Sequence, residues 1–256
     1  RQPLIQTPTV FWSLRQLSFL SLLNPVKVCI ERVSHNMTDV KLVIGNKRYS
    51  SWSLRGWLAM KLSGMPFEEV VVPLYRADSH INLKAVNPAA PPKVPSLIIG
   101  ENAIWDTLAI CEYLAEQCPD ARLWPEEIFA RARARSVVAE MHSSFIALRE
   151  HVPMDLSKRL PFERLPEEVE ADIARICEIW RECRALYSGK GPYLFGEISL
   201  ADVFFAPVLV RFFSRSVPLD ENCQAYFDAL WALPEFVEWR QAAEKEEWTI
   251  TSYDPK

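Results

Sequence analysis

The apolar and polar positions of the first half of the chain alternate between strand-like and helix-like patterns. Residues 40–44 and 67–74 are short apolar runs typical of strands. Between them, apolar residues recur at helical spacing from Leu54 to Leu62, and Gly64 then ends the predicted helix. A strand–helix–strand unit of this length predicts a right-handed crossover between two parallel strands.

A proline-dense loop over residues 87–95 leads into a predicted hairpin. Strand-like runs at 96–99 and 103–105 flank a turn at 100–102. Helical spacing then begins near Thr107 and ends at 117. The order βαβ, long loop, ββα is the order that a thioredoxin-type domain requires.

The second half of the chain has helical patterns throughout. Apolar residues repeat with a helical period over 137–148 and 169–183. Residues 200–213 are apolar nearly all round, which predicts a buried central helix, and Pro234 suits the first turn of a last helix. The sequence therefore predicts an α/β thioredoxin-like domain over 39–118, a linker over 119–127 and an all-α helical bundle domain over 128–256.

The first 36 residues differ in charge from the rest. They carry four basic residues and one acidic residue, a net charge of +3. A secretory signal and an organellar transit peptide are two functional interpretations of such a segment. The alternative is an extension outside the folded protein, with Met37 as its natural start. We expect residues 1–38 to be such an extension, and we expect its apolar stretch 11–23 not to pack against the domains.

Composition excludes several classes of function. Lys and Arg number 29 against 33 Asp and Glu, so the formal charge of −4 lacks the basic signature of a nucleic-acid binder. The sequence has no run of about 18 apolar residues that would predict a membrane span. The six Cys and four His show no metal-ligand spacing. We therefore expect no nucleic acid, no membrane and no metal, and buried thiols in a reducing, cytoplasmic setting.

Two serines stand where the first predicted helix begins. A hydroxyl of Ser50 or Ser51 lies beside helix amides that point outward and favour an anion. Such a hydroxyl can donate a hydrogen bond to a thiolate and lower the pKa of the thiol. The competing interpretation is a plain N-cap, a role that Ser fills on its own.

Two further patterns have both a chemical and a structural interpretation. Pro95 precedes a strand, and a cis Val94–Pro95 bond would let the Val94 main chain pair with a peptide-like ligand. An ordinary proline turn is the alternative. Asp106 and Thr107 could grip the amino and carboxyl ends of an amino acid, or could simply cap the next helix.

The order and spacing of these motifs resemble the cytosolic glutathione transferase superfamily from about Val40 to the end of the chain. Ser50–Arg55 is similar to the Ser-Ser-Cys-Ser-Trp-Arg motif of the zeta class, although Trp52 stands in place of its Cys. Residues 93–95 resemble the family's cis-proline loop, and Asp106-Thr107 stand where the family has Glu/Gln-Ser. Residues 196–202 resemble its helical capping box, in which Ser199 caps the helix and Asp202 reaches back.

The resemblance implies that the chain binds glutathione as its co-substrate. Ser51 is the expected catalytic residue, whose hydroxyl stabilises the thiolate, with Ser50 as the alternative. Arg55 is expected to serve helix and domain packing. Val94 would pair with the cysteinyl unit while Pro95 holds that geometry, the Asp106-Thr107 pair would hold the γ-glutamyl group, and Lys93 would meet the glycyl carboxylate. The binding residues implied are therefore Lys93, Val94, Pro95, Asp106 and Thr107.

The implied reaction is conjugation of the glutathione thiolate to small hydrophobic electrophiles, as in a detoxifying transferase. The electrophile would lie between the domains, with Met141, His142 and Phe145 as candidates for its wall; core packing is the competing interpretation for Met141 and Phe145. A glutathione-dependent isomerase, of the maleylacetoacetate isomerase kind, or a peroxidase is one alternative. A non-catalytic binding or regulatory protein of the same fold is another. The resemblance also implies a homodimer.

Overall fold

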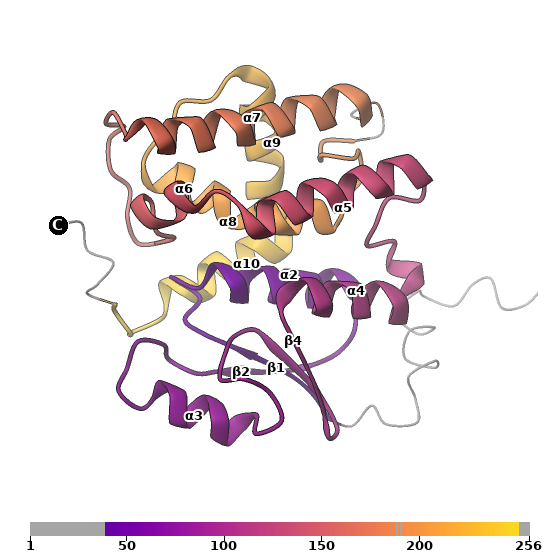
Figure 1. Cartoon of the computed structure of the whole chain (residues 1–256), viewed down its shortest axis with the longest axis vertical. Coiled ribbons are helices and arrows are strands. Elements are labelled where there is room, and N and C mark those ends of the chain that lie inside the picture. The colour runs from indigo at the N-terminus through magenta and orange to yellow at the C-terminus, as the bar shows by residue number, and fades with distance from the viewer. Residues whose placement is uncertain (1–38, 188, 190, 251–256) are drawn as a thin grey trace, which may run out of the picture.

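The computed structural model describes residues 39–187, 189 and 191–250. The predicted extension over 1–38, with its apolar stretch 11–23, lies outside the described residues. A small sheet with its helices forms one unit, and a larger group of helices is stacked on it (Figure 1). We call residues 39–117 the sheet unit and residues 128–250 the helical unit. This architecture confirms the predicted α/β thioredoxin-like part followed by an all-α part.

Four strands form a mixed sheet in the order β2-β1-β3-β4. β1 and β2 are parallel, which confirms the predicted crossover, while β3 is antiparallel to both of its neighbours. β2 is shorter than the predicted run of 67–74, because Pro73 has no N–H to continue the ladder. The strands are β1 (Val40–Ile44), β2 (Glu68–Val71), β3 (Ser96–Ile99) and β4 (Asn102–Trp105).

Helices cover both faces of this sheet. Helices α2 (Ser51–Ser63) and α4 (Thr107–Gln117) lie on the face toward the helical unit, and α3 (Ser79–Val86) lies on the other (Figure 1). The sequence pattern did not predict α3. Ile81 of this short helix is 68% exposed whereas Ser79 is buried, so its apolar positions do not mark its buried face.

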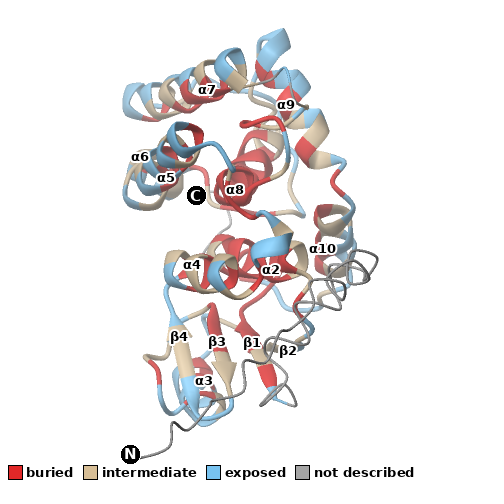
Figure 2. Cartoon of the chain, turned by 90° about the vertical axis from the view of Figure 1, so that its right-hand side faces the viewer, coloured by how far each residue is buried: buried red, intermediate tan, exposed pale blue. Residues whose placement is uncertain are grey.

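The helical unit is built around one fully buried helix. Every residue of α8 except Phe213 is buried, as the apolar run predicts, and Figure 2 shows α8 red along its length. A 3-10 turn (Pro119–Ala121) precedes the unit. Its helices are α5 (Ile128–Ser143), α6 (Ile146–His151), α7 (Glu167–Tyr187), α8 (Leu200–Ser214), α9 (Glu221–Trp231) and α10 (Pro234–Glu244).

The single helical repeat expected over 137–148 is divided between α5 and α6. Phe145 has φ 63°, a left-handed conformation that ends one helix and redirects the next. The side chain of Phe145 is nevertheless buried, so apolar spacing continues across the break and hides it from the sequence pattern. The end of α5 and the short helix α6 form a corner at Phe145, which we call the α5–α6 corner.

The capping box predicted at the start of α8 is present. The buried Asp202 carboxylate accepts hydrogen bonds from the N–H groups of Ser199, at 2.9 Å, and Leu194, at 3.1 Å. These donors favour the charged carboxylate, but burial outweighs them and raises the pKa of Asp202 to about 6.

Arg55 joins the two units, as expected from the sequence. Its guanidinium is fully buried between the rings of Trp52 and Phe204, at 4.6 and 5.1 Å from the ring centres, and its Nε donates to the Phe204 carbonyl at 3.0 Å. Burial lowers the pKa of Arg55, and stacking on the two aromatic faces partly replaces the hydration that burial removes.

None of the helices in the described part of the chain combines the length and the apolar character that a membrane span needs.

Candidate functional site

Three loops open at the same end of the sheet. In the strand register, Val43 near the end of β1 lies opposite Ser96 at the start of β3, and Ser96 lies opposite Trp105 at the end of β4. The loop after β1, the loop before β3 and the residue after β4 therefore meet at one edge. This edge faces the helical unit and brings together the serine, proline and aspartate motifs that are separate in the sequence.

Ser50 is the N-cap of α2. Its hydroxyl oxygen accepts the N–H of Ser53, at 3.3 Å, and its hydroxyl donates to the Ser53 oxygen, at 2.8 Å. Ser53 in turn accepts the Gly45 N–H at 2.9 Å, which ties the helix start to the end of β1. Of the two interpretations of the serine pair, the N-cap therefore holds for Ser50.

Ser51 is the first residue of α2 and is only 8% exposed. Within the part of the chain that the structure describes, its hydroxyl has no hydrogen-bond partner. It lies beside the unsatisfied amides of a helix N-terminus, where a bound anion is stabilised. Ser51 is therefore the serine that can offer its O–H to a ligand.

The Val94–Pro95 peptide bond is cis. Pro95 is buried directly against the backbone of α2, so closely that a Cβ built on Gly56 would lie 2.8 Å from the proline Cγ. The main-chain N–H and C=O of Val94 are not hydrogen-bonded to any described residue, which leaves both groups free to pair with a peptide-like ligand. Lys93 is exposed, and its carbonyl accepts the Ser96 hydroxyl at 3.0 Å.

Asp106 occupies an unusual backbone conformation at the start of α4. Its φ of 68° is rare for a residue with a side chain, and such positions concentrate at functional sites. One carboxylate oxygen caps α4 by accepting the Leu108 N–H at 2.8 Å. The other lies 3.5 Å from Nε2 of His142, and 52% of the side chain is exposed. Thr107, the next residue, is buried.

His142 is the wall candidate that reaches this edge. Its ring packs edge-on against Trp52, at 5.2 Å between centroids, and against Phe204 at 6.1 Å. Met141 and Phe145 are instead 1% and 5% exposed and belong to the hydrophobic core, so core packing is confirmed for both. The His142 imidazole therefore lies between Trp52, the residue after Ser51, and the carboxylate of Asp106.

The sequence did not indicate Arg149, which completes the cluster around Trp52. Its guanidinium lies 5.2 Å from the Trp52 ring centre, donates through Nε to the Ser144 carbonyl at 3.0 Å and hydrogen-bonds the Met141 carbonyl. Burial lowers the pKa of Arg149. The residues next to Arg149 in the sequence give no sign of this role. The contact with Trp52 crosses from the helical unit to the sheet unit, so only the folded chain shows it.

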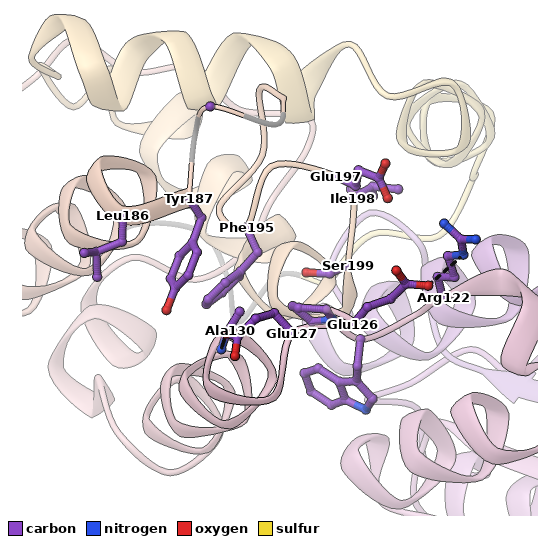
Figure 3. A pocket seen from close by; sticks show the side chains of 13 residues that line it. Arg122, Glu126, Glu127, Ala130, Leu186, Tyr187, Phe195, Glu197, Ile198 and Ser199 are labelled. Atoms are coloured by element: carbon purple, nitrogen blue, oxygen red, sulfur yellow. Dashed lines mark hydrogen bonds and ion pairs between the residues drawn. The ribbon is translucent and has the colours of Figure 1, made fainter.

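A separate pocket of about 570 Å³ lies where residues 122–127, which precede α5, meet the helical unit (Figure 3). Tyr187 and Phe195 line one side of it, and Glu126, Glu127 and Ser199 lie opposite. It contains none of the site residues predicted from the sequence. The predicted site is therefore defined by the edge of the sheet and the facing α5–α6 corner.

Two family models match the chain. The model described as "Glutathione S-transferase, N-terminal domain" matches residues 49–117, and the corresponding C-terminal domain model matches residues 166–242. These matches include the serine and aspartate motifs and the capping box.

Curated relatives fall in the same family. Glutathione S-transferase Z2 of Arabidopsis thaliana is 31% identical over 180 residues, covering 66% of this chain and 77% of the relative. A probable maleylacetoacetate isomerase of Caenorhabditis elegans is 37% identical over 101 residues, which is 40% of this chain and 46% of that protein.

Solved structures share the fold. A bacterial zeta-class maleyl pyruvate isomerase superposes with a TM-score of 0.62 at 25% identity, covering 81% of this chain and 100% of that structure. A Burkholderia glutathione transferase homologue, solved with bound glutathione, superposes with a TM-score of 0.60 at 22% identity, covering 82% and 100%. Together with the family models and the capping box, these likenesses show that the chain belongs to the glutathione S-transferase family.

Proposed function

We propose that the protein is a glutathione transferase that adds the glutathione sulfur to small hydrophobic electrophiles at the edge of the sheet. One observation carries the proposal. The Ser51 hydroxyl and the Val94 main chain, which have no hydrogen-bond partner among the described residues, converge on that edge with the half-exposed carboxylate of Asp106. They offer a donor for a thiolate, a strand-like partner for a peptide and an anion for an ammonium group.

Each part of glutathione has a proposed partner. The Ser51 hydroxyl donates to the thiolate sulfur, and the Val94 main chain pairs with the cysteinyl unit while Pro95 holds it against α2. The Asp106 carboxylate receives the γ-glutamyl ammonium. The start of α4 at Thr107 receives the γ-glutamyl carboxylate, because N-terminal helix amides favour anions. Lys93, which is exposed, meets the glycyl carboxylate.

The catalytic contribution of Ser51 is to keep the sulfur ionised. A free thiol has a pKa near 8.5, so only a few per cent is thiolate at neutral pH. A hydrogen bond from Ser51 together with the helix terminus lowers the thiol pKa by on the order of 1–2 units, about 1.4–2.7 kcal/mol. The thiolate then attacks the electrophile, forming the sulfur–carbon bond as the leaving group departs with its bonding electrons.

The electrophile is proposed to lie between the units, against the cluster of Trp52, His142 and Arg149. The His142 ring and the guanidinium groups of Arg149 and the neighbouring Arg55 all pack against the Trp52 ring, so contacts within the protein hold the cluster in place. The site is thus organised before the second substrate enters, which reduces the entropy that binding must cost.

A Ser51→Ala variant tests the role of the hydroxyl. We expect it to bind glutathione, to show a higher pKa of the bound thiol by ultraviolet absorbance of the thiolate, and to lose about 10- to 100-fold in kcat/KM at neutral pH. Ser136→Ala, at an exposed serine of α5, is the matched control and should behave as wild type. Full turnover by Ser51→Ala would remove Ser51 from the mechanism.

A glutathione-dependent isomerase is the second candidate, because several relatives are named maleylacetoacetate or maleylpyruvate isomerase. An isomerase adds the thiolate to a double bond and expels it again, so glutathione is not consumed. Assays with an aryl halide, a peroxide and a cis-dienoate, each following both product and free thiol, separate the reactions. Failure to bind immobilised glutathione would favour a non-catalytic role instead.

We also propose that the protein acts as a homodimer in the cytoplasm, as the family likeness suggests. Light scattering on the purified chain measures the first point, with the mass of a monomer as the contrary result. Cell fractionation measures the second, with recovery in a membrane or organelle fraction as the contrary result.

A further inference from the structure

His142 crosses from the helical unit to the start of α4 in the sheet unit. Its Nε2 lies 3.5 Å from Oδ2 of Asp106, and 27% of the His142 side chain is exposed. The other carboxylate oxygen, Oδ1, is already engaged by the Leu108 N–H. Nε2 therefore faces the one oxygen of Asp106 that remains available to a ligand.

The imidazole is held in place without any ligand. It packs edge-on to Trp52, with an angle of 64° between the ring planes, and lies against Phe204 on α8. The α5–α6 corner that follows it is fastened by the Arg149 hydrogen bonds to the Met141 and Ser144 carbonyls. The direction of Nε2 is thus set by packing within the protein.

We infer that His142 is a positioning residue for glutathione: its Nε2–H holds Oδ2 of Asp106 in the orientation that receives the γ-glutamyl ammonium. This inference rests on the proposed function, because it assigns that ammonium to Asp106. Asp106 of the sheet unit contacts the γ-glutamyl ammonium directly, and His142 of the helical unit contributes to its binding by holding Asp106. His142 acts on the carboxylate and does not touch the reacting sulfur.

The separation fits a contact that tightens when the ligand binds. An N–H···O hydrogen bond is typically about 2.7–3.2 Å long, so the pair needs a shift of only about 0.5 Å. Polar contacts at sites without ligand are often long and close in the complex. Removing the donor leaves the carboxylate held only through Oδ1 by the Leu108 N–H, so Oδ2 is less well oriented toward the ammonium. We expect a loss of about five- to tenfold in glutathione affinity.

Isothermal titration with glutathione alone tests this inference on the full chain. His142→Phe keeps a ring against Trp52 and Phe204 but removes the nitrogen, and should weaken glutathione binding about five- to tenfold. His142→Gln places an amide N–H near the position of Nε2 and should return the Kd to within about twofold of wild type. His151→Phe, at an exposed histidine of α6, is the matched control and should leave the Kd unchanged.

A second peptide isolates the ammonium. Glutaryl-cysteinylglycine has the carboxylate and thiol of glutathione but lacks the α-ammonium, so wild type and His142→Phe should bind it equally. With glutathione as the varied substrate, His142→Phe should raise the KM for glutathione about five- to tenfold while its affinity for glutaryl-cysteinylglycine stays at the wild-type level, a separation that general misfolding does not produce.

The contrary results are distinct. An unchanged glutathione Kd in His142→Phe, or an equal loss for both peptides, overturns the positioning role and leaves the proposed function standing. If circular dichroism shows that His142→Phe is unfolded, His142→Gln takes its place in the comparison. An equal loss of affinity of His142→Gln for both peptides then overturns the positioning role. If the wild-type protein binds neither peptide, the proposed function fails as well.

Discussion

Arg48 and Glu246 are joined by two hydrogen bonds although 198 residues separate them. The Arg48 main-chain N–H donates to the Glu246 carboxylate at 2.9 Å, and the Arg48 guanidinium donates to the Glu246 carbonyl at 2.7 Å. The neighbouring Lys47 N–H donates to the same carboxylate at 2.6 Å. The segment after α10 thus fixes the loop that leads into Ser50 and Ser51.

Removing this carboxylate should loosen the loop. In Glu246→Ala two partly buried N–H groups lose their acceptor, so we expect the free energy of unfolding in urea to fall by about 1–2 kcal/mol. Glutathione affinity should fall with it. Glu246→Gln keeps one acceptor oxygen and should recover part of the loss.

Glu238, on the preceding helix α10, provides the control for that experiment. Its ion pair with Lys61, at 2.8 Å, is solvent-exposed, and exposed pairs contribute little. Glu238→Ala should therefore stay within about 0.5 kcal/mol of wild type. If Glu246→Ala is equally neutral, the contact with Arg48 does not hold the loop.

The two serines of α2 should separate stability from activity. Ser50→Ala removes the N-cap and should lower the free energy of unfolding by about 1 kcal/mol. Ser51→Ala removes a hydroxyl that has no partner among the described residues, so its stability should stay near wild type while its turnover falls. Urea unfolding of both variants, compared with their kcat/KM values, checks this division; equal stability of the two contradicts it.

Asp202 should make stability depend on pH. Its pKa is about 6 in the folded protein against 3.8 for a free aspartate, so the folded state holds the proton more tightly. The stability that this group contributes is therefore full below about pH 4 and is lost as pH rises through 6. Because each pKa unit corresponds to about 1.4 kcal/mol, the change approaches roughly 3 kcal/mol.

The measurement compares wild type with Asp202→Asn, which does not titrate. Urea unfolding from pH 4 to 7 at constant ionic strength gives the difference in unfolding free energy between the two. We expect the unfolding free energy of wild type minus that of the variant to decrease by about 2.5 kcal/mol over that range, most of the full change. A difference that is flat, or that grows with pH, shows that burial does not control this carboxylate.

Gly56 should be required by the packing of Pro95 rather than by its own conformation. A Cβ at this position would lie 2.8 Å from the Pro95 Cγ and 2.9 Å from its Cβ, inside van der Waals contact. Gly56→Ala improves helix propensity by about 1 kcal/mol, yet overpacking should outweigh this and lower stability by about 1–3 kcal/mol. Glutathione affinity should fall too, because Pro95 moves together with Val94.

Gly189→Ala is the control for Gly56→Ala, since a Cβ there would have no atom of a described residue within 4 Å. Thermal unfolding and glutathione titration of both variants check the prediction. A Gly56→Ala protein as stable as wild type, with unchanged affinity, would mean that α2 and Pro95 separate without cost.

Local signals located most elements from the sequence. The helix starts at Ser51, Thr107 and Leu200 follow from capping residues immediately before them, and β1 and β3 have the predicted bounds. Caps and apolar periods involve residues three or four apart, so the sequence carries them directly. The division between α5 and α6 escaped because the left-handed Phe145 keeps its apolar spacing while changing the direction of the chain.

The sequence by itself determined the order of the elements, the capping box and the set of residues that the family likeness marks for glutathione. Only the tertiary structure decided that the Ser51 hydroxyl has no partner among the described residues, that His142 faces Asp106, and that Glu246 holds the loop at Arg48. The His142–Asp106 and Glu246–Arg48 contacts join residues from different units. Their existence depends on how α8 and α10 pack against α2, and packing between distant segments leaves no periodic trace in the chain.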